Sequence, residues 1–439
     1  MTQLPPIPEH RKAIYDYHRL CFDHRGCPMK RLPDGRVVFH PLLPAYLASD
    51  LIVEYTQTRE SSLLNHAEAI LDKALEHVSE LNNAWVFLYT PESGLSQHPV
   101  PFYSALTQAW YVKAICDLSR HIKPKKYRDA LSRVFNGLLI PIDAGGVLVK
   151  KQYGWILEEY PTKPPLYTLN GWLSVLRMVI ANRKMLERLG VVYAELLENN
   201  LNAVEHLLPR YDAGFCLNSR YQLTGFTRFR LVLNRPVSCA LNHFQVDIPE
   251  EGVFTGNSIK QTSYRWENYL ERREERLFQF NLVLSLISYP EPNVFSGEMN
   301  VDADCRVEAF MAQGDYSPTI SAMPTRKWQR IEAIDLKADA PNPLRIALPY
   351  DDQNLFAYPT NFNKKYGDQL FNAYHFVHIV TLSEMYAFSR RDVFREYALK
   401  WLDYSESWQH DSIYADQPFS LLPYKYGQDF RSHIEEKLR

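Results

Sequence analysis

The sequence lacks several features that would place it in a class at once. Its 439 residues contain no run close to the ~18 apolar residues of a membrane span, and the N-terminus has neither the basic nor the apolar part of a signal peptide. We therefore expect no membrane span and a cytoplasmic location, with secretion left open because a targeting segment can be trimmed. The formal net charge of −2 gives no basic excess, which argues against nucleic acid as a partner.

Cysteines are few and scattered. None of the six belongs to a Cys-x-x-Cys pair, and no zinc pattern is present. Cys21 and Cys27 are close enough in sequence for a bridge, but a chain without a signal peptide favours the reduced state.

The composition is otherwise that of a globular protein, with 46% hydrophobic and 23% charged residues. Aromatic residues make up 13%, including 28 Tyr and 8 Trp. Such rings stack on sugar faces, but they also fill the core of a large protein, and composition alone leaves both readings open. The length allows two to three domains, or one large helical toroid with an insert.

Apolar residues recur at helical spacing over two parts of the chain. One stripe runs through Leu63, Ala67, Ile70 and Leu71, and similar stripes flank it. Eight helices in consecutive hairpins favour an α/α toroid of about four hairpins. They are expected from residue 44 to about 55, and at about 63–78, 105–115, 127–138, 166–189, 191–208, 369–389 and 391–408.

Residues between these two helical parts alternate like strands, and Pro and Gly turns separate them. The clearest β-rich segments are 229–233, 278–284, 305–310 and 328–334. The predicted fold class is therefore α+β and multidomain, an α/α toroid with an inserted all-β, sandwich-like domain. We expect an N-terminal extension (1–40), the first part of the toroid (41–223), the β-rich insert (224–365), and the last helices with the tail (366–439).

Polar groups are concentrated in the segment Leu157-Glu-Glu-Tyr-Pro-Thr-Lys-Pro-Pro165, which Leu169-Asn-Gly171 follows. Its three prolines exclude helix and central strand and stiffen the loop. A stiff loop that holds two carboxylates, a phenol and a cation suits a binding site. The alternative is structural, since Glu158 and Glu159 could also cap a helix or balance Lys163.

Two further segments place a tyrosine at a junction beside a basic residue. Tyr221 lies in the stretch 212–223, and Tyr374 precedes His375 and His378 at a helix start. The two histidines lie three residues apart and could bind a metal, but no third ligand is evident, so no metal is expected.

These segments resemble parts of the D-glucuronyl C5-epimerases, and the chain looks like a bacterial-type homologue of that family. Residues 101–108 (Pro-Phe-Tyr-Ser-Ala-Leu-Thr-Gln) resemble the family's Pro-Trp-Tyr-Ser-Ala-Met-Ala-Gln, and residues 158–171 resemble its Glu-Glu-Tyr-Pro-Thr…Leu-Asn-Gly. Residues 374–379 (Tyr-His-Phe-Val-His-Ile) resemble Tyr-His-Thr-Thr-His-Ile. The resemblance covers about 40–223 and 368–408.

The family inverts C5 of glucuronate residues in a polysaccharide without a cofactor, so the resemblance implies an acidic, heparosan-like polymer as substrate and a homodimer. It implies that Tyr160, Tyr221 and Tyr374 are the acid–base residues, with Tyr221 and Tyr374 as the opposed pair and Tyr160 assisting. The residues that it places around the substrate are Gln108, Glu159, Lys163, Asn170, Arg220, Arg228, His375 and His378.

The chain departs from the family pattern in two places. An arginine that binds the carboxylate follows the family's Tyr-Asp-Leu, but here Tyr221-Gln222-Leu223 is followed by Thr224. Arg220, Arg228 or Lys163 would replace it. In the animal enzymes the β domain precedes the helices, whereas here the β-rich segment separates Tyr221 from Tyr374.

The chemistry explains why such residues are needed. Inversion removes the C5 proton on one face of the sugar and returns a proton on the other, which takes two acid–base groups. A cation near a tyrosine favours the phenolate, and cations or donors stabilise the enolate that forms on the carboxylate. The alternatives left open are a uronate lyase, which shares the first step, a glycoside hydrolase with paired carboxylates, and a sugar-binding protein without activity.

Overall fold

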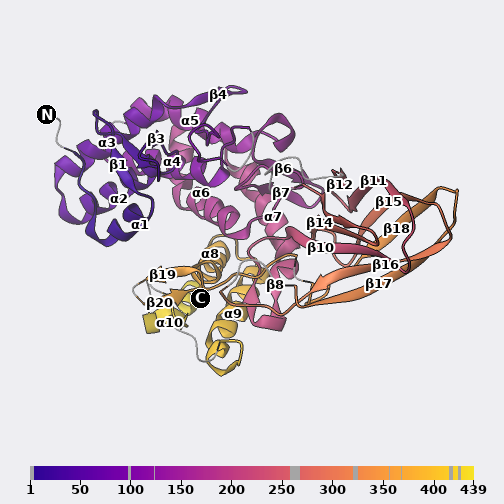
Figure 1. The fold of residues 1–439 in the computed structure, drawn as a ribbon. Helices are drawn as coiled ribbons and strands as arrows, with labels where there is room; N and C mark the ends of the chain where they lie inside the picture. Colours follow the sequence, from indigo (N-terminus) through magenta and orange to yellow (C-terminus); the bar gives the residue numbers. More distant parts are fainter. Residues whose placement is uncertain are drawn as a thin grey trace. The chain divides into compact units, whose positions relative to one another are not determined.

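The computed structural model describes residues 4–96, 100–122, 124–257, 267–319, 325–354, 356–366, 368–414, 419–423 and 427–439 (Figure 1). The α-helices of these ranges are α1 (Lys12–Tyr17), α2 (Leu43–Thr58), α3 (Ser61–Leu75), α4 (Ala105–Leu118), α5 (Arg128–Asn136), α6 (Leu169–Leu189), α7 (Ala194–Tyr211), α8 (Ala373–Ser389), α9 (Asp392–Ser407) and α10 (Phe430–Lys437).

The strands form small hairpins and two larger antiparallel sheets. They are β1 (Leu20–Phe22), β2 (Pro28–Arg31), β3 (Val37–Phe39), β4 (Ser79–Leu81), β5 (Ala84–Val86), β6 (Leu148–Lys151), β7 (Gly154–Leu157), β8 (Asp212–Ala213), β9 (Asn218–Ser219), β10 (Thr224–Leu233), β11 (Cys239–Ile248), β12 (Gly252–Thr255), β13 (Tyr269–Glu274), β14 (Leu277–Ser285), β15 (Asn293–Val301), β16 (Cys305–Gln313), β17 (Lys327–Leu336), β18 (Asn342–Leu348), β19 (Lys364–Tyr366), β20 (Gln369–Phe371) and β21 (Phe419–Ser420).

The chain divides into two compact units. The first comprises residues 1–161 and 171–204, and the second comprises residues 162–170 and 205–439. In the first unit, α2 packs against α3 and α4. Helix α3 buries Leu63, Ala67, Ile70 and Leu71, which recur every three or four residues and therefore share one face.

The second unit contains a five-stranded sheet in the order β13-β14-β10-β16-β17 and a four-stranded sheet in the order β12-β11-β15-β18. Strand β18 alternates buried and exposed residues along its whole length, as a strand with one buried face does. Phenylalanines join the two sheets: the ring centroids of Phe229 and Phe295 lie 4.8 Å apart, and those of Phe244 and Phe280 lie 4.9 Å apart. The core of this β-rich part is therefore aromatic.

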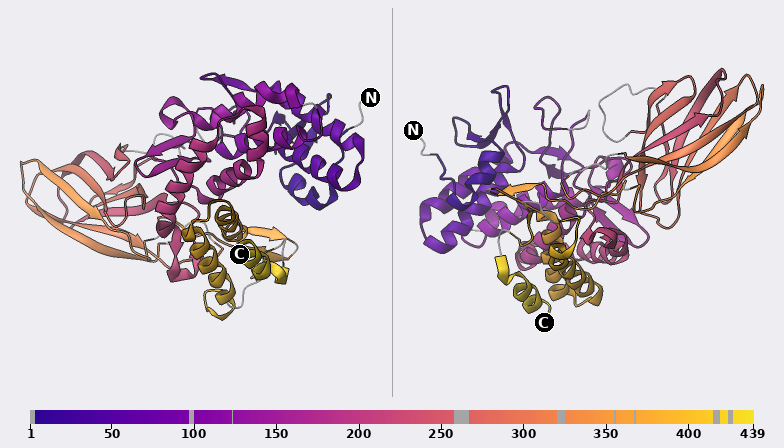
Figure 2. Two further views of the ribbon diagram at one scale, coloured as in Figure 1. Left: turned by 180° about the vertical axis from the view of Figure 1, so that it is seen from behind. Right: turned by 60° about the horizontal axis from the view of Figure 1, so that its bottom comes forward.

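The same unit contains α8 and α9, which lie side by side in both views of Figure 2. Helix α8 begins with Asn372 as its N-cap, whose side chain accepts a hydrogen bond from the His375 N–H. The cap fixes where the helix begins, and therefore the position of Tyr374 in its first turn.

The expected helices correspond to α2–α9, and the four β-rich segments correspond to parts of β10, β14, β16 and β17. The mixed α+β class is confirmed. Three helix starts were placed too early: the seventh helix begins at Ala373, because Gln369–Phe371 pairs as β20 with β19, the fifth begins at Leu169, and the sixth begins at Ala194. The toroid, the sandwich and the four-part domain division stay predictions.

All six cysteines are free thiols in the structure. Across the part of the chain that the structure describes, no helix is both long enough and apolar enough to cross a membrane.

Candidate functional site

A short extended segment, Asn218–Tyr221, organises the candidate site. Ser219 and Tyr221 exchange backbone hydrogen bonds with the loop at Tyr358–Thr360: the Tyr221 N–H donates to the Tyr358 carbonyl (3.1 Å), and the Thr360 N–H donates to the Ser219 carbonyl (2.8 Å). Successive side chains of an extended segment point to opposite sides. Ser219 and Tyr221 therefore face α8, and Arg220 faces the other way.

Tyr221 and Tyr374 meet in one pocket. Their ring centroids lie 5.0 Å apart, with 50° between the ring planes. The pocket has a volume of about 230 Å³, and both tyrosines are half-buried in its wall. Its other lining residues, most of them polar, are Gln222, Tyr358, Pro359, Thr360, Asn361 and Asn363.

Lys364 brings a positive charge to this pocket. Its Nζ lies 5.3 Å from the centroid of the Tyr374 ring, and the side chain is half-buried on β19. A cation at this distance from an aromatic ring is attracted by the ring face, so Lys364 places its charge next to a residue of the pocket wall.

Behind Tyr374, two buried histidines share one serine. The Ser219 Oγ lies 2.8 Å from the Nδ1 of His375 and 2.8 Å from the Nδ1 of His378. His375 Nε2 lies 2.9 Å from the Trp401 carbonyl, to which it donates, so its Nδ1 accepts. The Ser219 hydroxyl then donates to His375, and His378 Nδ1–H donates to the Ser219 oxygen. These bonds attach the first turns of α8 to the segment that carries Tyr221.

Burial keeps both imidazoles neutral. It lowers the pKa of His375 to about 4 and the pKa of His378 well below its ordinary value. A proton on either ring would have to be held inside the core.

We expect the protein to lose stability as the pH falls from about 6.5 to about 4. A histidine of the unfolded chain binds its proton near pH 6.5, whereas buried His375 binds one only near pH 4. Unfolding therefore takes up a proton between these pH values, and the full stability is present only above pH 6.5. His375 alone accounts for about 3 kcal/mol of the unfolding free energy, at ~1.4 kcal/mol per pH unit.

Urea unfolding at several pH values measures this slope. His375→Gln should reduce the slope by about one proton, whereas His410→Gln, which alters an exposed histidine of the same unit, should leave it unchanged. An equal slope in wild type and His375→Gln would contradict the assignment.

A buried amide network supports the same segment. Asn218 donates from Nδ2 to the Thr360 carbonyl (3.0 Å) and to the Tyr316 hydroxyl (3.1 Å). Its Oδ1 accepts from the Ser219 N–H (2.9 Å) and the Thr360 hydroxyl (2.6 Å), and from Asn372 (3.3 Å). Asn218, Thr360 and Asn372 are almost fully buried, so the network joins β9, the 358–361 loop and the cap of α8.

Tyr160 belongs to the first unit, whereas Tyr221 and Tyr374 belong to the second. Its ring centroid lies 6.0 Å from that of Phe102, and the residue is half-buried. Close by, Glu159 packs on Gly171: a Cβ there would lie 2.6 Å from the Glu159 Oε2 and 3.1 Å from its Cβ, so a larger residue would require the Glu159 side chain to shift.

The other predicted binding residues lie in varied surroundings. Gln108 is buried and bonded to backbone groups, accepting from the Phe87 N–H and donating to the Trp85 and Val134 carbonyls. Arg228 is exposed on β10 and lies 3.2 Å from Glu271. Asn170 is buried, and Lys163 is exposed.

Arg220 is buried on the side opposite Tyr221, where it lines a different pocket. The family's arginine position, Thr224, is buried, and its hydroxyl donates to the Ser285 Oγ (2.9 Å). Of the site residues predicted from the sequence, the structure brings together Tyr221, Tyr374, His375 and His378.

Several residues of the site were not predicted from the sequence. They are Lys364, Asn361 and Asn363 at the pocket and Asn218 and Ser219 behind it. A signal was present, because Asn361-Phe362-Asn363-Lys364 forms a polar cluster ten residues before Tyr374. Nothing in the sequence indicated that this cluster pairs with Tyr221.

Comparison with known proteins assigns this part of the chain. Residues 79–236 match the family described as the D-glucuronyl C5-epimerase C-terminus. The match bears out the predicted resemblance to this family over these residues. It includes Gln108, Tyr160, Asn170 and Tyr221, and it ends before Tyr374.

A D-glucuronyl C5-epimerase of Caenorhabditis elegans is a distant relative, 26% identical over 204 residues. The alignment covers 42% of this chain and 32% of the relative, so the chain matches about a third of that protein's length.

Among the described residues, no group of three or more His, Cys, Asp or Glu side chains is arranged to hold a metal ion.

Proposed function

We propose that the protein is a cofactor-independent uronate C5-epimerase that converts glucuronate to iduronate in a heparosan-like polysaccharide. The observation that carries the proposal is the Tyr221–Tyr374 pair, which lines one pocket beside Lys364 in a chain of this family. The α/α toroid with an inserted sandwich is the fold that we propose for it.

In the proposed reaction, one tyrosine acts as a phenolate and takes the C5 proton. The electron pair of the C–H bond moves into the carboxylate, which becomes an enolate dianion. The other tyrosine then donates its hydroxyl proton to the opposite face of C5, and the two tyrosines have exchanged protonation states. Each proton transfer of this kind contributes ~10²–10⁴-fold to a rate.

The pair constrains where the sugar lies. Ring centroids 5.0 Å apart leave no space for a sugar between the rings. We therefore propose that C5 lies between the two hydroxyl ends, one on each of its faces, and that Gln222, Asn361 and Asn363 of the lining bond the sugar hydroxyl groups. The assisting role of Tyr160 and the contacts of Glu159, Lys163, Asn170 and Arg228 stay predictions.

Lys364 is proposed to take the place of the family's arginine. Its ammonium group, beside Tyr374, would pair with the substrate carboxylate and stabilise the dianion as its charge grows. His375 and His378, both buried and neutral, would position Tyr374 through Ser219.

Lys364→Gln should lower kcat/KM about 100-fold, because it removes a group that binds the developing charge. Lys364→Arg should restore part of the activity. Lys365→Gln is the matched control, since Lys365 is the exposed neighbour on the same strand. If both glutamine variants lose the same activity, the effect is one of general charge and not of Lys364.

The function is tested by incubating the protein with unsulfated heparosan in heavy water and observing C5 by NMR. Deuterium at C5 together with iduronate signals is the expected result. Unsaturated chain ends that absorb in the ultraviolet would instead identify a lyase. Binding of the polymer without deuterium uptake would identify a sugar-binding protein, a result consistent with Thr224 at the arginine position.

A further inference from the structure

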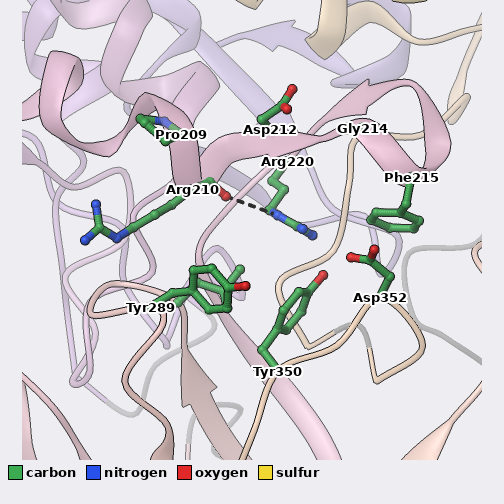
Figure 3. Close-up of a pocket in the computed structure, with 10 residues that line it drawn as sticks. Pro209, Arg210, Asp212, Gly214, Phe215, Arg220, Tyr289, Tyr350 and Asp352 are labelled. Atoms are coloured by element: carbon green, nitrogen blue, oxygen red, sulfur yellow. Dashed lines mark hydrogen bonds between the residues drawn. The ribbon is translucent and has the colours of Figure 1, made fainter.

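A second pocket of the same unit has no role in the proposed reaction. It has a volume of about 240 Å³, the share of about eight bulk water molecules. Its wall comes from the end of α7, the turn after β8, and the loops that follow β14 and β18, and Figure 3 shows its side chains. Its polar and aromatic side chains include Arg210, Phe215, Arg220, Tyr289, Tyr350 and Asp352.

Arg220 forms a fixed cationic wall. It is 4% exposed, and its Nε donates to the Arg210 carbonyl (3.1 Å) while Nη1 donates to the Ala357 carbonyl (2.9 Å). The guanidinium carbon lies 5.0 Å from the centroid of the Tyr350 ring and 5.7 Å from that of Phe215. The partners of the guanidinium are carbonyl groups and ring faces, which carry no formal negative charge. Its positive charge therefore remains at the wall.

Two polar groups at this pocket have unused hydrogen-bonding capacity. The Arg210 Nε–H is buried and has no hydrogen-bond partner within the described residues. The Tyr350 hydroxyl is also buried, and although Arg220 approaches it as a donor, no acceptor takes its own proton there. Figure 3 shows the Tyr350 hydroxyl directed toward Arg220, with the Asp352 carboxylate nearby. Buried donors that are left without an acceptor cost free energy, which a ligand with acceptor oxygens would recover.

The pocket also offers an aromatic surface. Tyr289 is 49% exposed, and its ring stands edge-on to that of Tyr350 at a centroid distance of 6.1 Å. A half-exposed ring supported by a second ring presents a flat apolar face, which suits the C–H face of a sugar.

The acidic residues cancel only part of the positive charge that Arg210 and Arg220 bring to the pocket. Asp212 is bonded to Lys400 Nζ (2.7 Å) and Trp401 Nε1 (3.0 Å), so its charge is already balanced. Asp352 is exposed at the edge and can accept hydrogen bonds from sugar hydroxyls.

We propose that this pocket binds a carboxylate-bearing sugar residue of an acidic polysaccharide, as a site separate from the Tyr221–Tyr374 pocket. The carboxylate pairs with Arg220, while Arg210 adds a second positive charge to the pocket wall. The ring lies on Tyr289, and Tyr350 and Asp352 bond its hydroxyl groups. The identity of the polysaccharide rests on the proposed function. Because Arg220 and Tyr221 are adjacent and face opposite sides, the two pockets share one backbone segment.

The test is calorimetric titration of the full chain with an unsulfated heparosan tetrasaccharide. Tyr374→Phe serves as the background, so that no turnover accompanies binding. Adding Tyr289→Ala should weaken one binding event at least about fivefold, the loss of one ring contact. Arg210→Gln should weaken the same event. The exposed Tyr17, changed to Ala, is the matched control and should bind as the background does.

An isotherm that neither Tyr289→Ala nor Arg210→Gln alters would overturn the proposal. Uncharged cellotetraose should bind at least about tenfold more weakly, as the loss of a charge-assisted bond requires, and equal binding would overturn the assignment of an acidic sugar. If the wild type takes up deuterium but polymer binding does not depend on Tyr289, this site is refuted and the epimerase is not. Tyr289-dependent binding without deuterium uptake refutes the epimerase and supports the site.

Discussion

Tyr374→Phe should lower the rate of C5 proton exchange about 10³-fold while leaving the fold intact. The substitution removes one hydroxyl from a half-buried ring and keeps its packing on Tyr221. A phenylalanine can neither take nor return a proton, and general acid–base groups contribute ~10²–10⁴-fold. Deuterium uptake from heavy water, followed by NMR, measures the rate.

The matched control is Tyr386→Phe, about three turns later on the same helix. It removes the same atom from the same element and should keep the wild-type exchange rate. Urea unfolding should place both variants within about 0.5 kcal/mol of the wild type. Exchange at the wild-type rate in Tyr374→Phe would remove Tyr374 from the mechanism.

Asn218→Ala should lower the unfolding free energy by about 3–4 kcal/mol, because it breaks several buried hydrogen bonds at once and leaves partners such as the Thr360 carbonyl unpaired. The same change should impair exchange, since the 358–361 loop and the α8 cap are both held by Asn218. Urea unfolding followed by tryptophan fluorescence gives the free energy.

Asn242→Ala serves as its control. Asn242 is exposed on β11 in the same unit and bonded only at the surface, to Glu298. Its loss should change the free energy by no more than about 0.5 kcal/mol. Were the two alanine variants to unfold at the same urea concentration, the buried network would contribute nothing to stability.

The sequence predicts what is local. Helix α3 follows from Leu63, Ala67, Ile70 and Leu71, since spacing alone places them on one face. Tyr374, His375 and His378 stand out because they form a compact motif at a helix start.

Long-range pairing is what the sequence does not predict. Lys364 precedes Tyr374 by ten residues, but Tyr221 and Tyr358 are separated by the whole β-rich segment. No local pattern specifies that Tyr221 pairs with Tyr358, or that Ser219 lies between two histidines. The start of α8 was misplaced for a similar reason, because Gln369–Phe371 is held as a strand by its partner and not by its own composition.

The alternation of side chains along Asn218–Tyr221 limits how this part of the protein can change. A substitution at Arg220 or at Tyr221 alters one pocket alone. The insertion or deletion of one residue would turn each following side chain to the opposite side and would disrupt both pockets at once. We therefore expect this segment to keep a constant length. Libraries that aim to alter sugar preference should substitute Arg220 and insert nothing, because Asn218, Ser219 and Tyr221 hold the network and the proposed reaction.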